Sequence, residues 1–143
     1  MTVDIFDESV LAAEYGAAWN SHDLRAIMAL HTADSTFRLQ LLDAPLMVGH
    51  DQVRGAFAGL LSTWPDIHFD TETTRYGPGF LTQRYRVTAT PAAPIPFGKM
   101  VIEPNGTPVS FAGLDILTFR MGLVHHKETY LDIADVMLQL GAL

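Results

Sequence analysis

The chain has no cysteine and only two lysines among its 143 residues. Without cysteine it can form neither a disulfide framework nor a zinc site or nucleophile built on thiolates. The formal net charge is −7, and no run of basic residues occurs anywhere. Because nucleic acids and anionic membranes are bound by clustered lysine and arginine, neither is an expected partner.

Long apolar runs are also missing. No stretch approaches the roughly 18 apolar residues that a membrane-spanning helix requires. The first ten residues carry early acidic residues and lack the apolar core of a secretory signal peptide. We therefore expect a soluble, cytoplasmic protein.

Apolar residues are nevertheless abundant. They make up 48% of the chain, against 17% charged residues, so the chain can bury a sizeable core. The length predicts one domain covering residues 1–143. The sequence contains no internal repeat, low-complexity tract or linker that would divide it.

The first half of the chain predicts helices. Asp7 can cap a helix that runs to about Asn20, and Asp23 can cap a shorter helix that follows it. A third helix has the strongest pattern, with apolar residues at i, i+3, i+4, i+7, i+8 and i+11. These residues are Val53, Ala56, Phe57, Leu60, Leu61 and Trp64. Pro65 then ends this helix.

The remaining segments favour strands. Residues 36–42 alternate weakly before a turn at Asp43-Ala44-Pro45, which predicts a short hairpin ahead of the third helix. Residues 67–76 and 80–90 flank a Gly-Pro-Gly connection and predict a second hairpin.

Residues 91–108 hold five prolines and predict a loop over a pocket mouth, with an edge strand near residues 99–102. A final hairpin and a short amphipathic tail at residues 136–143 complete the chain. Helices first and an antiparallel sheet afterwards predict an α+β fold, with helices on one face of a curved sheet. Such a sheet encloses an apolar cone, and the interior of the cone is the natural ligand site.

The final hairpin, residues 111–132, carries the most unusual side chains. A two-residue loop at Met121-Gly122 pairs Asp115 with Glu128 and gives both strands a common inner face. That face gathers Phe111, Asp115, Leu117, Phe119, Val124, His126, Glu128, Tyr130 and Asp132. Carboxylates, an imidazole and a phenol among apolar neighbours have the composition of a reactive pocket.

A second register is open at the same turn. A three-residue loop with a left-handed Gly122 turns the second strand over. His125 and Lys127 then lie opposite Leu117 and Asp115.

Three stretches carry a family resemblance: AEYGAAWNSHDLRAIMALHTADSTF, WPDIHFD and the pattern G-x-D-x-x-x-F-x-x-G that begins at Gly113. From Tyr15 to Gly141 the chain resembles the nuclear transport factor two-like superfamily. It is most similar there to the SnoaL-like polyketide cyclases and the ketosteroid isomerases. The resemblance implies a cone-shaped α+β barrel, in which a curved antiparallel sheet wraps around N-terminal helices.

The same resemblance implies a homodimer formed through the convex face of the sheet. Apolar residues that the first register places on that face are compatible with it. They are Leu114, Ile116, Leu123 and Leu131.

Ketosteroid isomerases supply two matches and one mismatch. Tyr15 matches their tyrosine that donates to the enolate oxygen, and Asp115 matches their protonated aspartic acid that makes the second such bond. A carboxyl group in an apolar wall keeps its proton and can donate to an oxyanion. Their general base falls at Leu39, however, and leucine cannot accept a proton.

Other branches of the superfamily place the acid elsewhere. In SnoaL-like cyclases it lies on the last strand, where Asp132 is the best match within residues 128–132. The arginine and aspartates of limonene epoxide hydrolase have no counterpart, because residues 83–86 contain no acid.

The candidate catalytic residues are therefore Asp115, Tyr15, Asp132, Glu128 and His126. The expected pocket wall is Trp19, Phe57, Leu117, Phe119 and Tyr130. Each has a structural alternative: Tyr15 as a core tyrosine, Asp115 paired with Arg84, Arg86 or Lys127, and Asp132 as a turn cap. His126 and Glu128 could equally face water. No metal is expected, since adjacent strand residues point to opposite faces, and no cofactor is expected.

These residues predict a cofactor-free enzyme. It would isomerise, cyclise or dehydrate a small apolar, cyclic carbonyl compound through an enolate. One alternative is a non-catalytic module of the same fold that binds a small ligand or dimerises. Another is an epoxide or ester hydrolase that uses a carboxylate-activated water.

Overall fold

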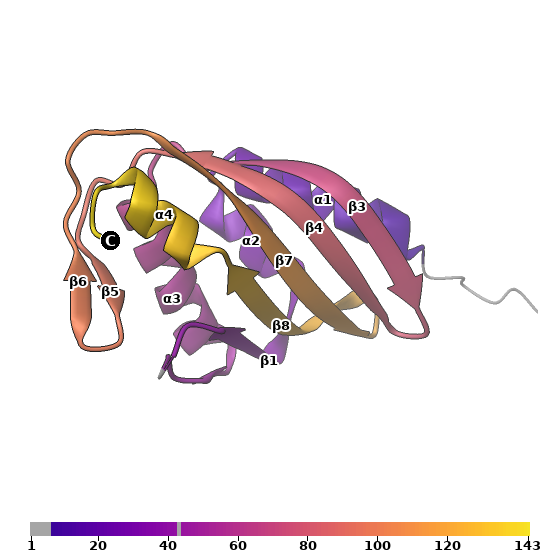
Figure 1. Ribbon diagram of the computed structural model, residues 1–143. Coiled ribbons are helices and arrows are strands. Elements are labelled where there is room, and N and C mark those ends of the chain that lie inside the picture. The colour runs from indigo at the N-terminus through magenta and orange to yellow at the C-terminus, as the bar shows by residue number, and fades with distance from the viewer. Residues whose placement is uncertain (1–6, 43) are drawn as a thin grey trace, which may run out of the picture.

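The computed structural model describes residues 7–42 and 44–143 (Figure 1). Residues 1–6 belong to the N-terminal segment for which the sequence predicted no secretory signal peptide, and they lie outside these ranges. Asp43 of the predicted turn lies outside them as well. The helices are α1 Glu8–Asn20, α2 Leu24–Ala29, α3 His50–Thr63 and α4 Ile133–Gln139. The strands are β1 His31–Leu39, β2 Met47–Val48, β3 His68–Gly77, β4 Phe80–Ala89, β5 Ile95–Phe97, β6 Met100–Ile102, β7 Val109–Arg120 and β8 Leu123–Leu131.

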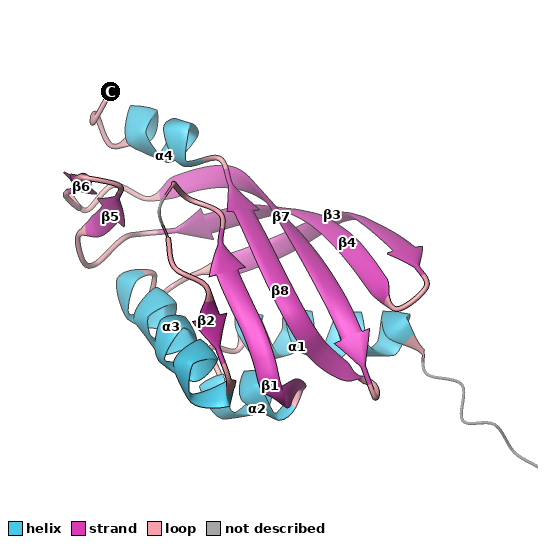
Figure 2. Ribbon diagram, turned by 90° about the horizontal axis from the view of Figure 1, so that it is seen from below, coloured by secondary structure: helices cyan, strands magenta, loops and turns pink. Residues whose placement is uncertain are grey.

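A curved six-stranded sheet in the order β2-β1-β8-β7-β4-β3 forms one layer (Figure 2). Helices α1, α2 and α3 lie against one face of it, and one apolar cluster joins them to β1, β4, β7 and β8. A second cluster joins α4 to the other end of the sheet. The predicted α+β fold is confirmed. The sheet is not wholly antiparallel, however, because β1 runs parallel to β8.

The predicted helix caps are confirmed. The Asp7 carboxylate accepts a hydrogen bond from the Ser9 N–H at 2.9 Å, and Asp23 accepts from the Ala26 N–H at 3.1 Å. Each satisfies a backbone donor that the first turn of a helix leaves unpaired. The third helix begins before its apolar pattern and ends, as predicted, just before Pro65. No helix within the described ranges is long and apolar enough to cross a membrane.

One predicted strand begins earlier in the structure, and two other β-segments lie where they are predicted. Strand β1 begins at His31 rather than Thr36, because its first residues pair with β8, a neighbour that local alternation does not reveal. The expected edge strand near residues 99–102 is β6, which pairs with β5 in a separate two-stranded hairpin. The β3–β4 hairpin lies where it is predicted.

The predicted two-residue turn of the final hairpin is confirmed. Arg120 pairs with Leu123, and both Met121 and Gly122 have positive φ, 53° and 76°. Two positive φ values are the geometry of a type I′ turn, which suits the twist of a hairpin.

The predicted register beyond that turn is wrong. His125 is an extra residue in β8, so Phe119 pairs with Val124 whereas Thr118 pairs with His126. Because side chains alternate with a period of two, one extra residue exchanges the faces of everything that follows. Asp115 consequently pairs with Thr129, not with Glu128.

The bulge decides which β8 side chains enter the core. Lys127 and Thr129 are buried, whereas His126 and Tyr130 are exposed and Glu128 is half-buried beside them. The alternative register correctly turns Lys127 inward, but it pairs Lys127 with Asp115, whereas the structure pairs Lys127 with Leu117.

The turn offers a test of this geometry. Met121 is 90% exposed and holds a left-handed conformation that asparagine adopts more easily. We expect Met121→Asn to raise the free energy of unfolding by roughly 0.5–1 kcal/mol, measured by urea denaturation. The β-branched Met121→Val is the control and should lower it. A less stable Met121→Asn would contradict the type I′ turn.

Candidate functional site

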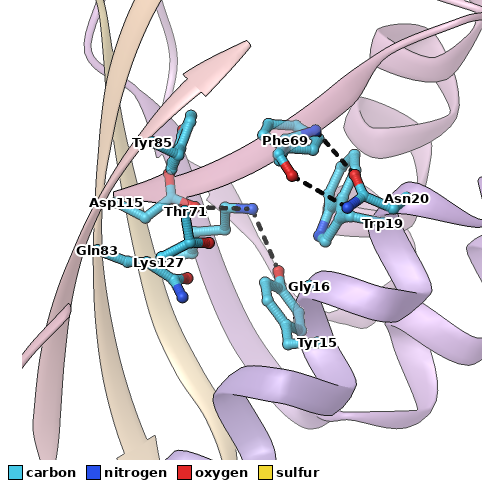
Figure 3. A pocket seen from close by; sticks show the side chains of 10 residues that line it. All are labelled: Tyr15, Gly16, Trp19, Asn20, Phe69, Thr71, Gln83, Tyr85, Asp115 and Lys127. Atoms are coloured by element: carbon cyan, nitrogen blue, oxygen red, sulfur yellow. Dashed lines mark hydrogen bonds and ion pairs between the residues drawn. The ribbon is translucent and has the colours of Figure 1, made fainter. Parts of the chain in front are cut away.

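A small cavity opens between α1 and the strands β3, β4, β7 and β8 (Figure 3). Its volume is about 50 Å³. It is lined by Tyr15, Gly16, Trp19, Asn20, Phe69, Thr71, Gln83, Tyr85, Asp115 and Lys127. A second cavity of about 40 Å³ adjoins it and is mostly apolar. The two share Trp19, Phe69, Tyr85 and Lys127 as a common wall.

A buried ion pair lies at the junction of the two cavities. The Asp115 Oδ2 and Lys127 Nζ atoms are 3.6 Å apart, and each residue is only 6% exposed. The other carboxylate oxygen, Oδ1, accepts hydrogen bonds from the hydroxyls of Tyr85 at 2.8 Å and Thr129 at 2.7 Å. These three partners are all donors, as suits an ionised carboxylate. These surroundings differ from the neutral, donating acid that the resemblance implied for Asp115.

Lys127 supplies a fixed positive charge. Burial alone would lower the pKa of its ammonium group, but the Asp115 carboxylate and the Tyr15 hydroxyl outweigh burial and raise that pKa. The Nζ atom also lies over aromatic rings, 4.4 Å from the centre of Trp19 and 5.1 Å from that of Phe57. Negative ring faces stabilise a desolvated cation. Lys127 therefore remains an ammonium group at neutral pH.

Tyr15 extends the pair into a row of polar groups. Its oxygen lies 3.3 Å from Lys127 Nζ and 2.8 Å from His31 Nε2. Because an ammonium group can only donate, the Tyr15 oxygen accepts from Lys127 and its own proton points to His31. Burial raises the pKa of Tyr15, so the phenol keeps that proton.

His31 at the end of this row is neutral. Burial first, and then the charges of Lys127 and His50, lower the pKa of its ring to about 3. A neutral imidazole can accept the Tyr15 proton at Nε2, which places its own proton on Nδ1. No hydrogen-bond partner of that Nδ1 atom occurs within residues 7–42 and 44–143.

Local structure explains why these side chains converge. Tyr15 and Trp19 are four residues apart on α1 and therefore share its inner face. Asn20 ties the end of α1 to β3, since its amide donates to the Phe69 carbonyl at 3.0 Å and accepts from the Phe69 N–H at 2.8 Å (Figure 3). The geometry fixes α1 against the sheet at the cavity.

Gly113 provides the space for Tyr85. A Cβ atom at Gly113 would lie 2.4 Å from the Tyr85 ring, closer than atoms can approach. The ring therefore packs directly on the backbone of β7, and from there its hydroxyl reaches Asp115. Burial also raises the pKa of Tyr85 well above its ordinary value, which keeps it a donor.

Two polar side chains in the lining are uncommitted. Within the described part of the chain, neither the Gln83 amide nor the Thr71 hydroxyl has a hydrogen-bond partner. Both are available to a bound molecule.

The structure brings together only part of the predicted site. Tyr15, Trp19 and Asp115 line the first cavity. Phe57 and Leu117 are fully buried in the adjoining core, and Phe119 packs against that core without lining either cavity.

The remaining predicted residues lie outside the cavities. His126, Glu128 and Tyr130 lie on the outer side of β8, because the bulge at His125 exchanges the two faces. Asp132 is exposed and caps α4 by accepting from the Asp135 N–H at 3.3 Å, the turn-cap alternative. The structure therefore does not bring these four residues to the two inner cavities, and Tyr130 and Asp132 line a separate, open pocket instead.

His31, Tyr85 and Thr129 were not among the residues predicted for the site, and Lys127 faced inward only in the alternative register. The available signal for Lys127 was that alternative register, since one extra residue in the second strand turns Lys127 and Thr129 to the inner face together. No three histidine or acidic side chains converge to hold a metal ion in the described ranges.

The profile of the SnoaL-like domain family matches residues 12–126. Solved structures with similar folds include AclR, a candidate hydroxylase from Streptomyces galilaeus, with 23% identity and a TM-score of 0.75 over 94% of this chain and 96% of that chain. TsrD from Streptomyces laurentii has 21% identity and a TM-score of 0.78, covering 99% and 100%. A candidate SnoaL-like polyketide cyclase from Jannaschia sp. CCS1 has 16% identity and a TM-score of 0.81, covering 100% and 99%. At these identities the structures show a shared fold alone. None of the curated proteins compared with the chain matches it.

The ion pair predicts non-additive effects on stability. Asp115→Asn and Lys127→Met each leave a buried charge without its partner, and we expect each to lower the free energy of unfolding by about 3–5 kcal/mol. The double variant removes both charges and should lose much less than the sum. Urea denaturation of the four proteins measures this coupling, and additive losses would rule out a direct charge pair.

The neutral state of His31 predicts a pH dependence. Its folded pKa of about 3 lies below the unfolded value of 6.5, so between these values the unfolded chain binds the extra proton. Stability should therefore fall as the pH falls through this range, by up to about 1.4 kcal/mol per pH unit from this group. In His31→Gln the thermal unfolding temperature should therefore change less between pH 6.5 and pH 4 than it does in the native protein.

Val53→Ala provides the control for this series, because it removes buried side-chain volume from the adjoining core without removing a titratable group. It should lower stability and retain the native slope. A His31→Gln slope equal to the native one would contradict the buried neutral imidazole.

Proposed function

Because the chain belongs to the SnoaL-like domain family, as its sequence resemblance predicted, we propose that it is an acid–base enzyme that forms an enolate from a small carbonyl compound. Asp115 removes the α-proton, and Lys127 and Tyr15 stabilise the oxygen that becomes negative. The observation that carries this proposal is the Asp115–Lys127 pair at the junction of two cavities.

The surroundings of Asp115 suit a base. Two hydroxyl donors hold its Oδ1 atom, whereas Oδ2 faces only the Lys127 ammonium at 3.6 Å. Oδ2 is therefore the oxygen that can accept a proton from a substrate carbon. Asp115 thus supplies the base that Leu39 cannot supply at the isomerase position.

Lys127 suits the opposite role. An ammonium group has three N–H bonds, and two are engaged by Tyr15 and Asp115. The third is available to a carbonyl oxygen. A preorganised donor of this kind typically contributes a factor of about 10²–10³ to the rate, because its charge need not reorganise as the enolate forms.

Tyr15 is the second donor. Its proton points to His31 in the free protein and would turn to the substrate oxygen as negative charge develops there. The Lys127 N–H at 3.3 Å supports this by making the phenol a stronger donor.

The geometry argues against two other reactions. A hydrolase that activates water between two carboxylates needs a second acid, and among the described residues that line these two cavities Asp115 is the only acid. A Schiff base on Lys127 needs a neutral amine, whereas its neighbours raise the pKa of this ammonium group.

Hydrogen–deuterium exchange at the α-carbon tests the proposal. Native protein in D₂O, incubated with enolisable ketones, should catalyse α-deuteration that NMR detects. Asp115→Asn should lower the exchange rate by about 10²–10⁴, because amide oxygen is a far weaker base.

Glu128→Gln removes a carboxylate from the outer face of the same hairpin and is the matched control. It should exchange at the native rate. Circular dichroism at the assay temperature establishes that each variant is folded. Equal rates for native protein and a folded Asp115→Asn would refute the assigned base and favour a binding module.

A further inference from the structure

An outer pocket adjoins the apolar inner cavity at Leu39. It is lined by Leu39, Leu41, Ala44, Pro45, Pro96 and Gly98, and its volume is about 250 Å³. Its walls come from residues on either side of Asp43 between β1 and β2 and from the β5–β6 hairpin. The two segments touch, since a Cβ atom at Gly98 would lie 2.7 Å from the Leu42 side chain.

Leu39 separates this outer pocket from the interior. Its side chain lines both the outer pocket and the 40 Å³ apolar cavity, which in turn shares Lys127 with the polar cavity. Leu39 is half-buried, at the edge of the core cluster that contains Phe37. The three cavities are thus neighbours: Lys127 lines the polar cavity and the apolar one, and Leu39 lines the apolar cavity and the outer pocket. We call this succession of cavities the route.

The route is narrow inside and wide outside. A cavity needs a volume of about 10–15 Å³ to hold one water molecule. The inner cavities, of about 50 and 40 Å³, therefore each have room for a few non-hydrogen atoms. A flat system of fused rings would have to displace Trp19 or Phe69, whose rings lie 5.9 Å apart. An unbranched chain has a smaller cross-section than fused rings and would displace fewer of the side chains along the route.

We propose that the substrate is an elongated carbonyl compound with an unbranched apolar tail, and that Leu39 sets the length of tail accepted. This inference rests on the proposed function and deepens it. The carbonyl group lies at Lys127, and the tail runs through the apolar chamber and past Leu39 toward the outer pocket. It replaces the cyclic substrate expected from the sequence.

The reaction at the head of the chain is balanced. The α-carbon loses its C–H bond, the proton moves to Asp115 Oδ2, and the electron pair forms the enolate whose oxygen Lys127 holds. Return of a proton from Asp115 restores the ketone. Neither oxidant nor further reactant is required.

A series of methyl ketones from 2-butanone to 2-decanone tests the route by binding. Each further methylene group buried in the route should tighten Kd about fourfold in the native protein, measured by thermal stabilisation. In Leu39→Trp the gain should stop where the tail meets the indole ring, while 2-butanone binds as in the native protein. In Leu39→Ala the gain should continue to at least the native length.

Two controls sharpen the result. Leu138→Trp adds the same side chain at a site on α4 that is 63% exposed, and it should reproduce the native series. The fused bicyclic 2-decalone has as many carbons as 2-decanone and should bind at least tenfold more weakly.

The outcomes separate the two proposals. Three results would each contradict an elongated substrate. They are a dependence of Kd on chain length that is native-like in both Leu39 variants, a Kd that does not change with chain length, and tighter binding of 2-decalone than of 2-decanone. Chain-length-dependent binding without α-deuteration in any ketone would leave the route intact and refute the proposed function. α-Deuteration together with a Kd that does not change with chain length would support the proposed function and refute the route.

Discussion

The buried pair of Asp115 and Lys127 is the interaction on which the rest of the site depends. Two opposite charges at 6% exposure are tolerated only because they face each other and because hydroxyl groups and aromatic rings surround them. That requirement explains the other features of the cavity. Tyr85 and Thr129 hold the carboxylate, Gly113 makes room for Tyr85, and the aromatic rings on α1 and α3 cover the ammonium group. A site so arranged holds both charges ready in the absence of a ligand, which is what proton transfer next to an oxyanion requires.

The sequence reveals the fold well, because the fold follows from local and repeated signals. Caps at Asp7 and Asp23, the apolar stripe of α3 and the Gly-Pro-Gly connection are each encoded within a few residues, and the structure places elements accordingly. The family resemblance reaches the same architecture by another route. Tyr15 and Asp115 could also be found, since one lies on the inner stripe of a helix and the other interrupts an apolar strand.

The positions of the other site residues depend on His125, an extra residue in β8 that no local sequence pattern indicates. The turn at Met121-Gly122 fits a two-residue loop, yet His125 adds a bulge that moves Glu128 outward and Lys127 inward. Whether a strand bulges depends on its partner on each side, and β8 pairs with both β7 and the parallel β1. The partner of Asp115 depends on the same bulge. Pairing with Lys127 was one of the alternatives that the sequence offered, and in the structure the bulge turns Lys127 inward, where its Nζ atom lies 3.6 Å from the Asp115 carboxylate.

The protonation of Lys127 tests this account most directly, and the chain has only one other lysine, Lys99. Lysine labelled with ¹³C at Cε therefore gives two NMR signals, and the Lys99→Arg variant assigns them. The account predicts that Lys127 keeps its ammonium chemical shift up to and beyond pH 10.4, the usual lysine pKa, because Asp115 and Tyr15 outweigh burial. In Asp115→Asn the same signal should titrate at lower pH. A native Lys127 that loses its proton well below pH 10 would contradict the account, because burial would then dominate and the cavity would lack its fixed positive charge.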